Sequence, residues 1–217
     1  MSAPRSEEEA PRFLPSRDEH AVDITHRRLP HWTCDRVIYW ITFRLADSLP
    51  QSRLQEWRVE RDIWLQRNPK PWTDTQFREF NDLFGDRLET WLNAGYGSCA
   101  LARPDVRRVV QESLLRFDGD RLLIHAAVIM PNHVHVLMEP LGKNRLSKVL
   151  QGIKGASARR ANVLLGTTGT FWLDESFDHI LCSEAQYRYL VDYIADNPRK
   201  AGLRENQYWH YQNTCEK

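Results

Sequence analysis

Two histidines separated by a single residue, His133 and His135, are the side chains of this chain best placed to do chemistry. The apolar and β-branched residues around them predict a β-strand. Alternate side chains of a strand point to the same face, so the two imidazoles are expected to lie side by side. Neutral imidazole is the commonest metal ligand in proteins. The pair therefore predicts half of a metal site, and the alternative is two histidines on a solvent-facing strand.

A second pair, Tyr193 and Asn197, lies four residues apart near the end of the chain. Ser183 and Gln186 form a capping-box pattern that predicts the start of a helix. Pro198 disfavours helical geometry in the residue before it and predicts the end of the helix at Asn197. Residues four apart share one helix face, so the phenol and the amide point the same way. Taken alone, the pattern is also typical of a buried tyrosine followed by a helix-terminating Asn-Pro.

Together these four residues suggest metal-assisted chemistry on a phosphodiester. Two imidazoles and an amide oxygen can hold a divalent cation, Mg2+ or Mn2+, and leave coordination positions open. Such a cation stabilises the charge that develops as a phosphodiester is displaced. Tyrosine has a pKa of about 10, so only about a thousandth is ionised near neutral pH, and a cation nearby would assist its attack. The product would be a covalent phosphotyrosine, which stores the energy of the broken phosphodiester bond for a later religation.

The two motifs and their flanking residues resemble the single-tyrosine HUH transposases, and among these the REP-associated tyrosine transposases. The HUH motif is matched by residues 133–135 within the strand-turn-strand sequence 128–136. The family pattern Tyr-Ile-x-x-Asn-Pro, followed by Ala-Gly-Leu, is matched by residues 193–203. Similar stretches occur at 29–32 leading into 41–50, and at 169–172 leading to 177–179. Leu173 departs from the pattern, because many relatives have a polar residue there, often Gln.

The resemblance implies a nuclease and strand transferase that acts on single-stranded DNA folded into palindromic hairpins. Tyr193 would attack a phosphodiester to form a 5′-phosphotyrosine and release a 3′-hydroxyl, while His133, His135 and Asn197 would hold the metal. The oligomeric state stays open between monomer and homodimer. Mobile relatives are dimers that exchange the tyrosine helix, whereas REP-associated members complete the site within one chain.

Several alternatives remain open from the sequence. The chain would be a domesticated hairpin-binding protein if its cleavage chemistry were lost. Replication initiators and relaxases use the same chemistry but add a helicase or primase region, and a metal-dependent hydrolase would lack the covalent step. His179 is an alternative third ligand to Asn197, and Tyr189 is a rival nucleophile one turn before Tyr193.

The net charge of the 217 residues is only +1, but basic residues cluster locally. Residues 141–160 contain six basic side chains and no acidic one: Lys143, Arg145, Lys148, Lys154, Arg159 and Arg160. The segment directly follows the histidine strand and reads as a helix. It predicts a basic face beside the metal pair that contacts the DNA backbone. The alternative is an ordinary solvated helix face.

The pattern of apolar residues predicts an α+β fold. Strands are expected at 36–43, 121–130, 133–139 and 170–173, and helices at 52–67, 73–93, from Pro104 to 114, and over the basic and tyrosine segments. One helix before the central hairpin and one after it predict a ferredoxin-like antiparallel sheet with helices on one face. The stretch 51–117 is expected to contain an inserted helical hairpin. With Met130 opposite His133, His125 would face away from the two histidines.

Residues 28–205 are expected to form one domain, preceded by a disordered arm (residues 1–27) and followed by a tail (206–217) that covers the sheet or contacts DNA. The chain has no run of about 18 apolar residues and no signal-peptide pattern, which predicts a cytoplasmic protein that does not enter a membrane. The widely spaced Cys34, Cys99, Cys182 and Cys215 are expected to be free thiols.

Overall fold

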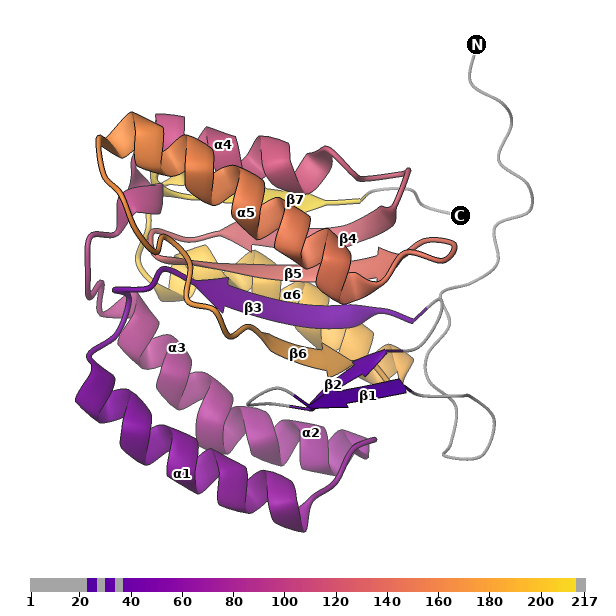
Figure 1. Cartoon of the computed structure of the whole chain (residues 1–217). Coiled ribbons are helices and arrows are strands. Elements are labelled where there is room, and N and C mark those ends of the chain that lie inside the picture. The colour runs from indigo at the N-terminus through magenta and orange to yellow at the C-terminus, as the bar shows by residue number, and fades with distance from the viewer. Residues whose placement is uncertain (1–22, 27–29, 34–36, 214–217) are drawn as a thin grey trace.

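A five-stranded antiparallel sheet forms the centre of the protein in a computed structural model that describes residues 23–26, 30–33 and 37–213 (Figure 1). The strand order is β6-β3-β5-β4-β7. The bounds are β3 (Tyr39–Arg44), β4 (Leu122–Ile129), β5 (His133–Pro140), β6 (Phe177–Ile180) and β7 (Trp209–Gln212). The chain order β3-α4-β4-β5-α5-β6 is that of a ferredoxin-like unit and confirms the predicted fold class. The histidine strand β5 lies in the middle of the sheet.

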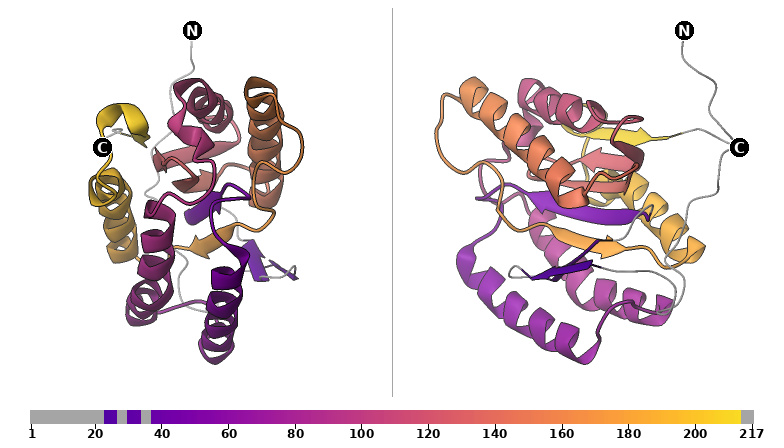
Figure 2. Two further views of the ribbon diagram at one scale, coloured as in Figure 1. Left: turned by 90° about the vertical axis from the view of Figure 1, so that its left-hand side faces the viewer. Right: turned by 45° about the vertical axis from the view of Figure 1, so that its right-hand side comes forward.

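Helices cover both faces of this sheet, whereas the prediction placed them on one face. The crossover helices α4 (Pro104–Leu115) and α5 (Leu146–Leu165) cover one face, as predicted (Figure 2). The tyrosine helix α6 (Glu184–Lys200) and the inserted helices cover the other. Side chains alternate between the two faces along β3 and the residue before it. Tyr39 and Ile41 join the α4–α5 core, while Ile38 and Trp40 join the opposite core. A strand buried on both faces reads as one continuous apolar run.

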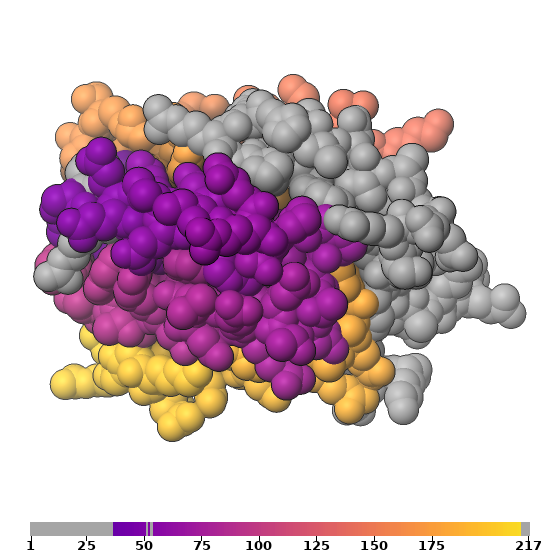
Figure 3. Space-filling model, turned by 90° about the horizontal axis from the view of Figure 1, so that it is seen from below, coloured from indigo at the N-terminus to yellow at the C-terminus, as the bar shows by residue number. Residues whose placement is uncertain are grey.

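The inserted helical hairpin is present and is built from the predicted helices. It comprises α1 (Gln51–Arg67) and a second, nearly continuous rod made of α2 (Asp74–Phe80), the π-helical turn η1 (Asn81–Gly85) and α3 (Asp86–Asn93). An aromatic stripe on the second helix, Phe77, Phe80 and Phe84, is buried against the sheet. Because α4 belongs to the ferredoxin-like unit, the inserted hairpin itself spans 51–93 and not the whole of 51–117. Seen from below, its helices form the middle of the molecular surface (Figure 3).

The predicted strand at 170–173 is wrong, and the edge strand is β6 instead. Trp172 makes only an isolated bridge with Leu45, and its ring is buried in the core, where Nε1 donates to the Ser157 hydroxyl at 2.9 Å. Residues 177–180 pair with β3. The sequence did not predict this strand because it contains Asp178 and His179, and charged and polar residues are uncommon in buried strands.

The tyrosine helix does not end at Asn197, as predicted, but continues through Pro198 to Lys200. A Schellman motif closes it: the Leu203 N–H donates to the Pro198 carbonyl at 2.9 Å, and Gly202 N–H donates to the Arg199 carbonyl at 3.0 Å. Gly202 adopts the left-handed φ of +66° that this motif requires. Pro198 has no N–H, so one helical hydrogen bond is missing in the last turn of α6.

The ends of the chain add short elements. The tail forms β7, which pairs with β4 and so covers the sheet edge, after a short 3-10 turn, η3 (Glu205–Gln207). Of the predicted disordered arm, residues 1–22 and 27 lie outside the described residues, while β1 (Asp23–His26) pairs with β2 (Pro30–Thr33). A 3-10 turn, η2 (Ala100–Ala102), precedes α4.

Cys99 and Cys182 are free thiols, as predicted, and Cys34 and Cys215 lie outside the described residues. Within the part of the chain that the structure describes, no helix has the length and apolar character needed to cross a membrane.

The left-handed Gly202 gives a stability prediction. An alanine at this position would have to adopt a φ of +66°, which costs an L-residue about 1–2 kcal/mol. We expect Gly202→Ala to lower the free energy of unfolding by about 1 kcal/mol in urea denaturation. The matched control is Gly152→Ala in α5, where the added Cβ would meet Phe117 Cε2 at an ordinary 3.7 Å. This control should stabilise the protein by about 0.5–1 kcal/mol, and equal effects of the two substitutions would contradict the assignment.

Candidate metal and nucleophile site

The turn at residues 131–132 places both histidines at the beginning of β5. Met130 N–H donates to the His133 carbonyl at 2.9 Å, which fixes the register, and Val128 lies opposite His135. Both imidazoles are buried on the face covered by α6, with ring centroids 4.7 Å apart. The predicted side-by-side arrangement of the pair is therefore present, and the alternative of a solvent-facing pair is wrong.

Hydrogen bonds at the Nδ1 atoms orient both rings. Asn132 donates from Nδ2 to the Leu92 carbonyl at 3.0 Å, so its Oδ1, 2.8 Å from His133 Nδ1, must act as the acceptor. His133 consequently donates from Nδ1, and its neutral ring carries a lone pair on Nε2. His135 Nδ1 lies 2.8 Å from the Thr42 hydroxyl, which can donate or accept. Partners of this kind orient the ligand atoms of metal-binding histidines.

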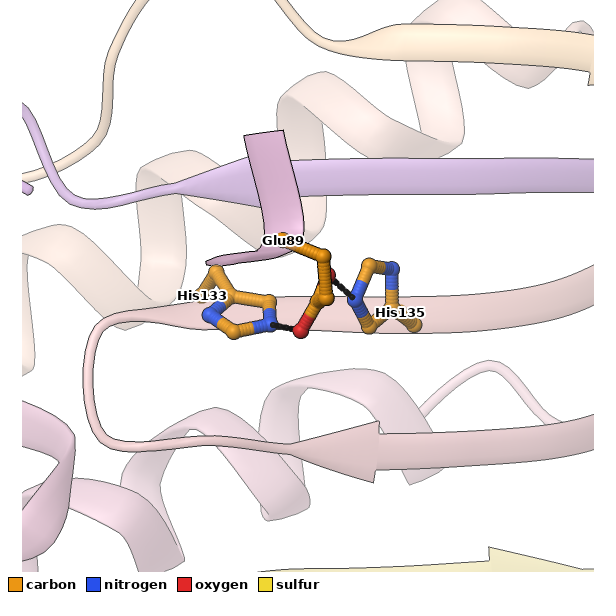
Figure 4. A group of neighbouring side chains, drawn as sticks. All are labelled: Glu89, His133 and His135. Carbon is orange, nitrogen blue, oxygen red and sulfur yellow. Dashed lines mark hydrogen bonds and ion pairs between the residues drawn. The ribbon is translucent and has the colours of Figure 1, made fainter. Parts of the chain in front are cut away.

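The third member of the site, Glu89 of α3, was missed by the sequence analysis. Its carboxylate lies between the two imidazoles, with Oε1 at 3.2 Å from His133 Nε2 and Oε2 at 3.0 Å from His135 Nε2 (Figure 4). These three ligand atoms all lie within 4.8 Å of one another. The sequence signal that could have found it is helical spacing: Glu89 is three residues before Leu92, so it lies on the same helix face as an apolar residue. In the structure both residues are buried.

The electrostatics of this group fit a bound divalent cation. Burial raises the pKa of Glu89, and it is positive charge on the facing His133 and His135 that would more than offset burial and hold that pKa well below its ordinary range. Burial lowers the pKa of His133, which favours its neutral ring. Glu89 Oε1 and His133 Nε2 are only 3.2 Å apart, yet neither has a hydrogen-bond partner among the described residues. Two acceptors facing each other in a buried site are unfavourable, and a cation between them removes the conflict.

Tyr193 joins the same group through its hydroxyl, which donates to Glu89 Oε2 at 3.0 Å. Burial and the adjacent Glu89 carboxylate strongly raise the pKa of the phenol, so it is neutral in this arrangement. Trp40 packs edge-on against the Tyr193 ring at 5.9 Å. The rival nucleophile Tyr189 stacks on Tyr193 with ring centroids 6.3 Å apart and is 41% exposed, whereas Tyr187 packs beside His125.

Asn197 lies one helical turn after Tyr193 and is fully buried. Neither its Oδ1 nor its Nδ2 has a hydrogen-bond partner among the described residues. An unsatisfied buried polar group costs about 1–3 kcal/mol, so binding of a ligand by this amide would be favourable.

Two other histidines do not belong to the site. His179, the alternative third ligand, is stacked against Trp72 and Phe77, and its Nε2 lies 3.2 Å from Gln186 Oε1. His125 was predicted to face away from the histidine pair, and this is wrong. A β-bulge between Ile124 and Ala126 turns its ring onto the face covered by α6, where it packs beside Tyr187.

The predicted basic helix lies on the opposite face of the sheet from the histidines, so it does not form a basic face beside them. Lys154 Nζ donates to the Leu173 carbonyl at 2.7 Å, and Arg160 pairs with Glu112 of α4 at 2.5 Å. The remaining basic side chains of this segment are exposed to solvent: Lys143, Arg145, Lys148 and Arg159.

A different basic feature, a cleft with three arginines, adjoins the site. It lies between α1 and the β3–β6 edge, and it includes Thr42, the hydrogen-bond partner of His135. Burial and the nearby Arg58 lower the pKa of Arg44 to about 10. The cleft is lined by Thr42, Arg44, Leu54, Trp57, Arg58, Arg61, Leu88, Leu173, Glu175, Ser176 and Phe177. Leu173, which stands where many members of the family have a polar residue, therefore contributes an apolar surface to the cleft.

Comparisons with known proteins find similarity to transposases. Residues 103–197, from the start of α4 to Asn197, match the family model described as IS200-like transposase. A solved REP-associated tyrosine transposase bound to a REP hairpin is 19% identical, with 83% of this chain and 76% of that chain covered and a TM-score of 0.44. A protein of Deinococcus radiodurans R1 described as a transposase is 14% identical, with 85% and 98% covered and a TM-score of 0.32. No curated protein matches the chain.

The orientation of His133 by Asn132 gives a prediction on metal affinity. Asn132→Ala removes the acceptor that fixes the His133 ring, and loss of such a partner typically weakens metal binding about 10–100-fold. We expect a loss of this size in a calorimetric titration of the purified protein with Mn2+. The control is Asn162→Ala, which removes an exposed amide hydrogen bond to the Gly169 carbonyl at the end of α5. Unchanged Mn2+ affinity in a folded Asn132→Ala protein would argue against the assigned ring orientation.

Proposed function

We propose that this chain is a transposase-like enzyme that cleaves and rejoins single-stranded DNA, and the match of residues 103–197 to the IS200-like transposase family model supports the proposal. Its substrate would be a palindromic hairpin, as in the REP-associated tyrosine transposases that the motifs resemble. The observation that carries the proposal is the meeting of Tyr193 with the histidine pair, through hydrogen bonds to one carboxylate. This arrangement lies within a single chain, which supports a monomer as the active unit over a homodimer that shares the site. The proposed location of the enzyme is the cytoplasm.

Tyr193 is the proposed nucleophile. Its oxygen attacks the scissile phosphorus, an O–P bond forms, and the bond from phosphorus to the 3′-oxygen breaks. The products are a 5′-phosphotyrosine and a free 3′-hydroxyl, so the phenol proton is balanced by the proton taken up by the departing oxygen. Rejoining is the reverse reaction with a 3′-hydroxyl of another strand end. The step needs no oxidant, reductant or nucleotide cofactor.

His133, His135 and Asn197 are the proposed metal ligands from the family motifs, and the metal is Mg2+ or Mn2+. The partnerless amide of Asn197 and the lone pair on His133 Nε2 support this assignment. When bound, the cation would neutralise charge on the phosphodiester and favour ionisation of the phenol. The protein's own groups position the substrate: Asn132 and Thr42 fix the imidazoles, and Trp40 fixes the Tyr193 ring.

The arginine cleft is the proposed path of the DNA strand near the scissile bond. Arg44, Arg58 and Arg61 supply positive charge next to Thr42, where strand phosphates would lie and would compete with Glu175 for Arg58 and with Asp62 for Arg61. The exposed basic residues of the α5 segment remain candidates for contacts to a hairpin stem, further from the reacting atoms. Their place on the opposite face of the sheet makes them secondary to the cleft in this proposal.

A second function, hairpin binding without cleavage, is favoured by one observation. The Tyr193 hydroxyl is bonded to an ionised carboxylate, and burial and that carboxylate raise its pKa. A phenol held in this way is a poor nucleophile, so a chain fixed in this arrangement would bind DNA without cutting it.

Covalent capture of DNA separates the two functions. The protein is incubated with Mn2+ or Mg2+ and labelled single-stranded oligonucleotides that carry the palindromes flanking its gene, and the mixture is analysed on a denaturing gel. We expect a metal-dependent protein–DNA band that disappears in Tyr193→Phe. The control, Tyr189→Phe, changes the neighbouring stacked ring and should keep the band. Tight binding without any covalent band in the parent protein would establish the hairpin-binding function instead.

The arginine cleft gives a prediction on salt dependence. Each lost phosphate contact reduces the slope of log affinity against log salt by about 0.7 for a single strand. We expect Arg58→Gln to reduce the slope by about this amount in fluorescence-anisotropy titrations. Arg188→Gln is the control, since Arg188 is 75% exposed on α6 and pairs with Glu184 of the same helix. Equal slopes for the parent and Arg58→Gln would remove the cleft from the DNA path.

A further inference from the structure

The inserted hairpin reaches the centre of the site, and we propose that Glu89 of α3 is an anionic ligand of the metal. In this proposal the ligand set is His133, His135 and Glu89, completed by Asn197. The inference deepens the proposed function, since it concerns the same site, but it rests on metal binding and not on DNA cleavage. Glu89 lies outside residues 103–197, the part of the chain that matches the family model.

The first argument is geometric. Each carboxylate oxygen of Glu89 faces one imidazole Nε2, at 3.2 and 3.0 Å, and the ligand atoms fit within 4.8 Å of one another. Metal–ligand bonds are about 2.0–2.2 Å for imidazole nitrogen and carboxylate oxygen. A cation placed among the three groups would therefore need only small movements of side chains that are already directed toward it (Figure 4).

The second argument is the charge of the buried group. Glu89 is 7% exposed and lies beside two buried imidazoles, on a face whose core consists mostly of aromatic and aliphatic side chains. A buried carboxylate is costly unless it is paired with a positive charge or coordinates a metal. A divalent cation supplies that charge and also gives a partner to His133 Nε2 and Glu89 Oε1, which have none among the described residues.

The third argument is that α3 holds the histidine hairpin at a second point. The carbonyl of Leu92, one turn after Glu89, accepts from Asn132, and Asn132 in turn orients His133. One helix of the insertion therefore contributes a ligand and also supports the ring opposite that ligand. Two such contacts make the insertion part of the active centre and not merely a cover over the sheet.

The same carboxylate links metal binding to the nucleophile. Glu89 Oε2 accepts hydrogen bonds from both His135 and Tyr193. A cation bound by Glu89 would weaken the hydrogen bond from Tyr193, so the phenol would become available to a phosphodiester. Glu89 is thereby also a positioning residue for Tyr193, whose hydroxyl donates to Glu89 Oε2 at 3.0 Å.

The test is a calorimetric titration of the full-length, chelator-treated protein with Mn2+ in the absence of DNA. Glu89→Gln keeps the size of the side chain and removes its charge, and we expect Mn2+ affinity to fall at least tenfold. Glu79→Gln is the matched control, because Glu79 is an exposed carboxylate of the same insertion that accepts from Trp64, and its affinity should stay within twofold. Tyr193→Phe should bind Mn2+ as tightly as the parent or more tightly, because the competing hydrogen bond is gone.

An affinity of Glu89→Gln within twofold of the parent would overturn the proposal and leave Glu89 as a residue that only holds Tyr193. If Glu89→Gln does not fold, Glu89→Asp keeps the charge but shortens the side chain. Its Co2+ complex should then show a visible absorption spectrum different from that of the parent, and an identical spectrum would overturn the proposal. The covalent-capture assay on the parent protein is read separately, so a failure of DNA cleavage is distinguishable from a failure of Glu89 as a ligand.

Discussion

The structure depends on one constraint: β5, the central and fully buried strand, carries two imidazoles on its inner face. A buried polar group without a partner costs about 1–3 kcal/mol, and each imidazole brings two nitrogen atoms. Asn132 and Thr42 satisfy the Nδ1 atoms. Glu89 of α3 faces both Nε2 atoms: its Oε2 lies within hydrogen-bond distance of His135 Nε2, whereas His133 Nε2 has no hydrogen-bond partner among the described residues. The packing of the insertion on this face is thus tied to the chemistry of the strand beneath it.

The sheet order explains how distant parts of the chain meet there. With β5 between β3 and β4, Thr42 of β3 lies directly beside His135, and α6 returns across the same face to bring Tyr193 over Trp40. The insertion leaves the sheet after β3 and returns before α4, so both of its ends are fixed by the ferredoxin-like unit. Its aromatic stripe then packs on the same core as Tyr193, and this shared core keeps α3 in register with the histidines.

Much of this arrangement could be predicted from local patterns, and the exceptions have physical causes. The helices of 51–93 and the central hairpin follow from periodicity, and the shared face of His133 and His135 follows from the alternation of a strand. The β-bulge at His125 and the Schellman motif after Pro198 depend on neighbouring elements, which a local pattern does not contain. The basic helix was placed on the wrong face because adjacency in sequence does not fix the side of a sheet to which a crossover helix returns. Glu89 was missed for a related reason: it meets His135 from 46 residues away, through a contact that only the tertiary fold creates.

The charge of the site bears on what it can bind. With Glu89 ionised and the imidazoles neutral, the side chains that surround the proposed cation carry a single negative charge, so a loaded site would have a net charge of about +1. A phosphodiester carries one negative charge, so its complex with the loaded site would have a net charge near zero. Without the carboxylate, the same site would be doubly positive and would hold the phosphodiester substrate and the phosphotyrosine product more tightly. A strand transferase must bind its phosphodiester, pass it to tyrosine and return it to a new 3′-hydroxyl, and such a cycle is favoured by a site that binds reactant and product with similar, moderate strength. If Glu89 is a metal ligand, as proposed, its carboxylate suits reversible transfer better than one-way hydrolysis.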